Sequence, residues 1–213
     1  MVGIMVDVMK RNKLYGLIIL LTVEMFTLSS AHAAFCSLRD PVSAIQILYK
    51  GDYQYRSLTA TVAEQDRLAV KEKLPFTLHK SEVGKHTLYL IYKNGEHTGF
   101  LQARSEWAKW GLIEIAWAIN LDRSLKGFYF QRCRSPECND TVVNNINKHL
   151  HNKSLEQLML FLSADGESLS EAGESAFSTS PKIALLVLRS ALKTLAITDI
   201  SWAKDIEKIE AGY

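Results

Sequence analysis

The chain has 213 residues, 25 basic and 23 acidic residues, a formal net charge of +2 and three cysteines. A nearly balanced charge without a basic stripe indicates neither a nucleic acid nor an anionic membrane surface as a partner. This length suits one domain with a sizeable core.

The N-terminus has the pattern of an export signal. Basic residues at 10–13 precede an apolar run at 14–28, and Ala31-His32-Ala33 has the spacing that signal peptidase prefers. We predict a cleavable signal peptide at 1–33 and an exported, periplasmic domain at 34–213. The alternative is an uncleaved membrane anchor, although a span needs about 20 apolar residues and Glu24 interrupts this run.

The first elements after the signal are predicted as helix, strand and helix. Pro41 to Tyr49 has apolar residues at helical spacing and proline in the first turn. Tyr53 to Thr59 has the aromatic and β-branched character of a strand. The run 61–64 resembles a capping box, and it predicts a helix that ends near Leu74, before proline.

A β-meander is predicted in the middle of the chain. The strands 86–92 and 98–105 flank Lys93-Asn94-Gly95-Glu96, and Asn-Gly is a strong hairpin signal. The almost continuously apolar run 112–119 indicates a central strand covered on both faces. A fourth strand at 125–131 places Phe128 and Phe130 on one face.

The C-terminal part is predicted to be mainly helical. Apolar spacing indicates helix from 140 to 162 with an interruption near Asn152. The Ser-, Gly- and acid-rich segment 163–180 lacks periodicity, and we expect a flexible loop or lid there. A helix follows, with Ser180 as N-cap and Pro181 in its first turn. We therefore predict an α+β fold, an antiparallel meander packed against N- and C-terminal helices.

The cysteines favour a local disulfide. Cys133 and Cys138 lie in a turn-like loop of an exported domain, where disulfides persist. Pairing them leaves Cys36 free, but a bridge from Cys36 to either loop cysteine stays open. Their spacing is too wide for a thioredoxin-type redox pair. Because His149 and His151 have no third ligand nearby, we predict no metal. No nucleophile–base arrangement identifies a catalytic residue.

The order of motifs through the meander resembles the FMN-binding domain family. The motifs are Thr98-Gly99-Phe100, Trp110-Gly111-Leu112-Ile113-Glu114, the turn Ile119-Asn120-Leu121-Asp122, Leu125-Lys126-Gly127-Phe128, and Arg134-Ser135-Pro136-Glu137. That family comprises exported flavin-carrying domains of sodium-pumping and ferredoxin-linked membrane oxidoreductases and of nitrous-oxide reductase regulators. The resemblance covers about half of the exported part.

The resemblance implies FMN as cofactor and a membrane redox complex or another exported electron-transfer protein as partner. It places the flavin phosphate at the start of the late helix, at Ser178, Thr179 and Ser180. It places Arg134 and Ser135 near the flavin, and we expect Trp110 beside Gly111 to stack on its ring.

The phosphate stretch departs from the family pattern. It lacks glycine and alanine, and Pro181 removes one N–H donor, which argues against covalent attachment. The alternative function is therefore a non-catalytic exported binding or assembly module that keeps the fold without flavin.

Overall fold

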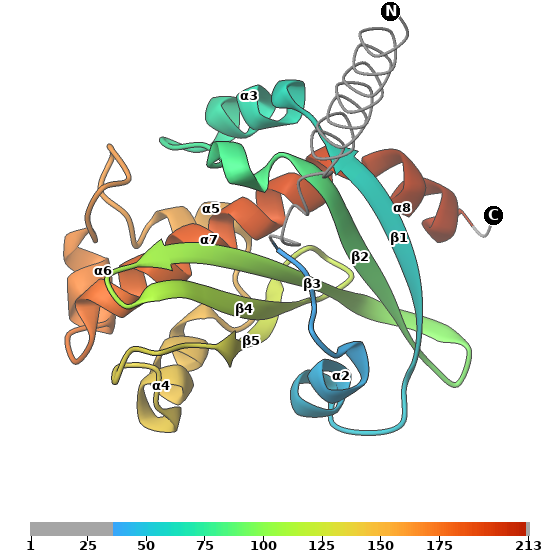
Figure 1. Ribbon diagram of the computed structural model, residues 1–213, viewed down its shortest axis with the longest axis horizontal. Helices are drawn as coiled ribbons and strands as arrows, with labels where there is room; N and C mark the ends of the chain where they lie inside the picture. Colours follow the sequence, from blue (N-terminus) through green and yellow to red (C-terminus); the bar gives the residue numbers. More distant parts are fainter. Residues whose placement is uncertain (1–35, 212–213) are drawn as a thin grey trace, which may run out of the picture. The chain divides into compact units, whose positions relative to one another are not determined.

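Five antiparallel strands form one sheet in the computed structural model, which describes residues 36–211 (Figure 1). Their order in the sheet follows their order in the chain, as expected for the predicted meander. The predicted signal peptide, and the membrane anchor that is its alternative, lie outside the described residues. The strands are β1 (Gln54–Val62), β2 (Gly84–Lys93), β3 (Glu96–Ala108), β4 (Gly111–Ile119) and β5 (Leu125–Arg132).

The β2–β3 hairpin turns at Asn94-Gly95, as predicted. Both residues have positive φ, 53° and 85°, between the paired residues Lys93 and Glu96. Two positive φ values define the two-residue turn that matches strand twist, and asparagine and glycine adopt them most readily. This turn fixes the register of two central strands.

One face of the sheet is covered by helix α2 (Pro41–Tyr49). The helix begins at Pro41, and the Asp40 carboxylate accepts hydrogen bonds from the Val42 and Ser43 amides. At its other end the Tyr49 hydroxyl donates to the Phe100 carbonyl at 2.8 Å. Ala44 and Ile45 on its apolar side form a small cluster with four residues of the sheet, Ile91, Leu101, Ala116 and Ala118.

The opposite face carries the main core and the long helix α7 (Pro181–Ser201), which crosses the sheet in Figure 1. Trp117 of β4 is fully buried there, and its Nε1 donates to Ser190 Oγ of α7 at 3.2 Å. The sheet therefore lies between an N-terminal and a C-terminal helix, which confirms the predicted α+β fold. The other helices are α3 (Glu64–Lys73), the 3-10 turn η1 (Lys80–Glu82), α4 (Asp140–Leu150), α5 (Leu155–Met159), α6 (Glu171–Ala176) and α8 (Ala203–Glu210).

Helix α4 protects the edge strand β5. The Asn147 side chain accepts a hydrogen bond from the Phe128 amide and donates one to the Phe128 carbonyl, each at 2.9 Å. His151 Nδ1 lies 2.7 Å from the Lys126 carbonyl. Unpaired edge groups are a template for aggregation, and these contacts occupy part of that edge.

Two sequence predictions need correction. Thr61 does not cap a helix, because β1 continues to Val62; instead the Asp66 carboxylate accepts from the Ala63 amide at 2.7 Å at the start of α3. The segment 163–180, predicted as a flexible loop or lid, contains the helix α6. A Cβ on Gly173 would lie 2.2 Å from the Phe161 carbonyl oxygen, so the segment is packed closely against its neighbours.

Candidate functional site

The residues that the resemblance assigned to flavin come from three elements: a hairpin turn, a disulfide loop and a helix start. Lys109 and Trp110 join β3 to β4, and Gly111 follows with φ of 98°. The Trp110 ring is 55% exposed, with Lys109 Nζ 5.5 Å from its centre. Trp110 is therefore accessible from solvent.

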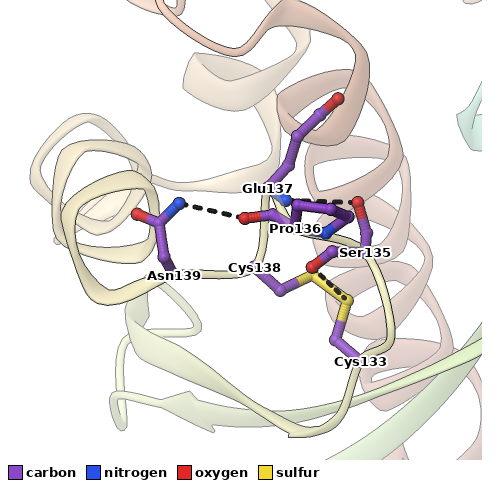
Figure 2. The surroundings of a disulfide bond; sticks show 6 residues. All are labelled: Cys133, Ser135, Pro136, Glu137, Cys138 and Asn139. Carbon is purple, nitrogen blue, oxygen red and sulfur yellow. Dashed lines mark hydrogen bonds between the residues drawn. A yellow bond between two sulfur atoms is a disulfide. The ribbon is translucent and has the colours of Figure 1, made fainter.

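The disulfide loop begins where β5 ends, at the same end of the sheet as this hairpin, since Arg132 pairs with Glu114 near the start of β4. As the sequence predicted, Cys133 is bonded to Cys138, with their Cα atoms 6.2 Å apart (Figure 2). The Ser135 carbonyl accepts from the Cys138 amide at 3.1 Å. The bridge and this hydrogen bond both close the loop.

The two predicted ligand residues in that loop differ in availability. Arg134 is exposed to solvent, whereas Ser135 Oγ accepts a hydrogen bond from the Glu137 amide at 3.3 Å (Figure 2). Asn139 closes the loop by donating to the Pro136 carbonyl and by capping the first turn of α4. Arg134 can therefore reach a ligand, while the Ser135 side chain is already engaged.

The start of α7 has free hydrogen-bonding capacity. Ser180 occupies the N-cap position, as predicted, but its side chain makes no capping hydrogen bond. The side chains of Ser178 and Thr179 are exposed. N–H groups in the first turn of a helix lack intrahelical partners, and the helix dipole favours an anion beside them. This end of α7 can therefore receive an anionic group.

Helix α4 connects the disulfide loop with the start of α7. It follows the loop directly, and its Asn145 Nδ2 donates to Thr179 Oγ1 at 3.3 Å. Within residues 36–211 no hydrogen bond or cation–π contact joins Trp110 to Arg134 or Ser180. The structure thus brings the disulfide loop and the helix start to neighbouring positions through α4, with the tryptophan on a separate turn.

A buried charge cluster, formed by Glu82, Arg104, Glu106 and Lys193, was missed in the sequence. Arg104 Nη1 lies 3.3 Å from a Glu82 carboxylate oxygen. Lys193 Nζ lies 3.0 Å from Glu82 and 2.7 Å from Glu106. The cluster joins η1, β3 and α7, with two positive and two negative side chains.

Burial and pairing act in opposite directions on these groups. Burial alone would raise the pKa of Glu82, but Arg104 and Lys193 outweigh it and lower that pKa. Burial raises the pKa of Glu106, against the attraction of Lys193. Burial and, to a smaller extent, repulsion by Arg104 lower the pKa of the nearby His86 to about 4.

The sequence did contain signals for this cluster. Lys193 lies on the apolar stripe of α7 between buried residues. Arg104, four residues after Phe100, lies on the same core-facing side of β3. A charged residue at such a position is buried only when it is paired. A charged residue near the end of a strand is usually solvated, but the Arg104 side chain is fully buried.

The unpaired cysteine is also buried. The Cys36 amide donates to Ser105 Oγ at 3.0 Å, and Arg104 Nη1 lies 3.8 Å from its sulfur. Burial raises the pKa of the Cys36 thiol. Of the pairings left open by the sequence, the structure has Cys133 with Cys138 and leaves Cys36 free.

Comparison with known proteins identifies no family for this chain. No protein-family model matches the chain, and no curated protein matches it.

Among the described residues, no group of three or more histidine, cysteine, aspartate or glutamate side chains is placed to hold a metal ion. None of the helices between residues 36 and 211 has the length and apolar character of a membrane span.

Proposed function

We propose that this protein is an exported domain that binds FMN without a covalent bond and exchanges electrons with a membrane redox complex or another exported electron-transfer protein. The observation that carries the proposal is the start of α7. There a 21-residue helix begins without a side-chain cap, at the position where the family resemblance puts the flavin phosphate. Phosphate is a ligand for which helix N-termini are suited.

The side chains around this position are compatible with a phosphate. Thr179 and Ser178 add exposed hydroxyl groups, and Asn145 holds the Thr179 hydroxyl from α4. Arg134 would supply a planar, charged donor from a loop fixed by the disulfide. Pro181 offers no N–H group, so the amides of Lys182 and Ile183 would serve the phosphate.

When bound, FMN would supply the electron chemistry, and the protein would position it and adjust its environment. Trp110 is exposed on a neighbouring turn and is suited to contact an aromatic ring. Arg134 and the helix dipole would both favour the doubly charged phosphate. These groups account for binding and orientation, and no residue here is assigned a catalytic role.

The first test is the visible absorbance of protein purified after export, before and after acid precipitation. We expect flavin absorbance that moves to the supernatant, because attachment is non-covalent. Flavin in the pellet would contradict that part of the proposal. Protein that binds no flavin after FMN is added would refute the function altogether.

A threonine substitution tests the phosphate position. We expect Thr179→Val to weaken FMN binding about tenfold, because a hydrogen bond to a charged group contributes about 1.5 kcal/mol or more. Titration of FMN fluorescence gives the affinity. Thr59→Val changes an exposed threonine on the edge strand β1 and should leave the affinity unchanged. Equal affinity for the wild type and Thr179→Val would exclude Thr179 as a ligand.

The second candidate function is a non-catalytic binding or assembly module. It is favoured by the exposure of two tryptophans near the β3–β4 turn, Trp107 at 62% and Trp110 at 55%. Exposed aromatic residues are common at protein interfaces. A folded protein without flavin affinity would select this function.

A further inference from the structure

A groove lies beside α7. It has a volume of about 500 Å³, within the range of small-molecule sites. None of the side chains proposed to hold FMN lines it, although Lys182, whose backbone amide belongs to the proposed phosphate site, contributes to its lining. Its walls come from the segment after α3, the end of β3 and the first four turns of α7. The lining comprises Phe76, Thr77, Leu78, His79, Glu106, Trp107, Lys182, Leu185, Leu186, Arg189 and Lys193.

The charges in this groove leave a positive excess. Lys193 and Glu106 neutralise each other at 2.7 Å. Lys182 is exposed and has no ion pair within the part of the chain that the structure describes. Among residues 36–211, the one ion pair of Arg189 is with Glu167, a residue that is itself exposed, and such a pair is weak in water. Lys182 and Arg189 can therefore attract an anion.

Arg189 is held in place before any ligand arrives. Its guanidinium carbon lies 4.5 Å from the centre of the Phe76 ring, and its Nη1 donates to the Gly166 carbonyl at 2.9 Å. A guanidinium that is stacked and tethered loses little further freedom when it binds a planar or tetrahedral anion. Arg189 lies in the third turn of α7, seven residues or about two turns after Lys182, so both residues lie on the same side of the helix.

The rest of the lining is largely apolar. Leu185 and Leu186 of α7 supply partly exposed aliphatic surface, the nearly buried Phe76 and Leu78 add little to it, and the exposed Trp107 lies at the end of β3. We propose that this groove is a second binding site, for a small amphipathic anion. Its carboxylate or phosphate head would pair with Lys182 and Arg189, and its apolar body would lie against the leucines and Trp107.

Calorimetric titration of the exported protein with matched ten-carbon probes tests this site. Decanoate and decyl phosphate should bind, and the stronger of the two identifies the preferred head group. Decanol, which has no charge, and acetate, which has no apolar body, should bind at least tenfold more weakly. From hexanoate to decanoate, affinity should rise by up to about fourfold per methylene. Equal binding of decanol and decanoate, or affinity independent of chain length, would overturn the proposal.

Charge variants locate the head group. Lys182→Gln and Arg189→Gln should each weaken decanoate binding by up to about fivefold, and the double variant by about tenfold. The control Lys204→Gln/Lys208→Gln removes two exposed lysines from α8 and should bind like the wild type. Circular dichroism confirms that each variant folds. Unchanged decanoate affinity in the folded Lys182→Gln and double variants would overturn the assignment.

Competition with FMN separates this site from the proposed flavin site. Decanoate affinity should be the same with and without saturating FMN, and it should persist if FMN does not bind at all. Displacement of decanoate by FMN would show one shared site and would overturn the proposal of a second one.

Discussion

Glu82 is the residue on which the buried charge cluster depends. Its carboxylate lies 3.3 Å from Arg104 and 3.0 Å from Lys193, and its side chain is 1% exposed. We expect Glu82→Gln to lower the free energy of unfolding by about 3–5 kcal/mol, because it leaves buried positive charge without its partner. Urea denaturation measures this change. Glu64→Gln breaks an exposed pair with Arg67 and should cost less than about 1 kcal/mol. Similar losses in both variants would contradict this account.

At the scale of single residues, the sequence predicted what depends on local chemistry. The Cys133–Cys138 pair follows from its short spacing, and burial of Trp117 follows from its apolar strand. The partners of Arg104 did not follow, because Glu82 and Lys193 are distant in sequence and meet only when η1 and α7 pack on the sheet. Contacts of this kind need the topology as well as the pattern.

At the scale of elements, two serine N-caps should behave differently. Ser180 makes no capping bond at α7, so Ser180→Ala without flavin should change the unfolding free energy by less than about 0.5 kcal/mol. Ser170 Oγ accepts from the Gly173 amide at 3.2 Å and donates to the Leu160 carbonyl at 2.6 Å, so Ser170→Ala should cost about 1 kcal/mol or more. Thermal or urea unfolding compares them. A larger loss at Ser180 would show that its hydroxyl does cap α7.

Elements that are long, or that are marked by a proline or an Asn-Gly turn, were predictable from the sequence, whereas the short helix α6 was not. The Asn94-Gly95 turn, β4 and the helix that begins at Pro181 each carry a strong local signal. The predicted break near Asn152 agrees with the separation of α4 from α5. Helix α6 has only six residues, two of them glutamate and one glycine, and it is packed closely around Gly173. Periodicity cannot detect a helix of that length.

At the scale of the whole molecule, the buried charge cluster and the neighbouring His86 make the stability of the fold depend on pH. His86 is buried in β2, its Nε2 lies 2.7 Å from the Glu82 carbonyl, and its neighbours Arg104 and Glu82 are both charged. Its pKa is about 4 in the folded protein, against 6.5 ordinarily. Between these values the unfolded chain binds a proton that the folded chain does not, so stability falls as pH falls from 6.5 to 4.

Glu82 and Glu106, the two carboxylates of the cluster, change the loss of stability at low pH in opposite directions. The lowered pKa of Glu82 adds to it, whereas the raised pKa of Glu106 partly offsets it. From His86 alone we expect a loss of up to about 3 kcal/mol by pH 4. Urea unfolding at a series of pH values measures it. His86→Gln removes the titrating ring, so this variant should lose less stability than the wild type on acidification. His79→Gln, at an exposed histidine, should keep the wild-type slope. Equal slopes in all three proteins would place the acid sensitivity elsewhere in the fold.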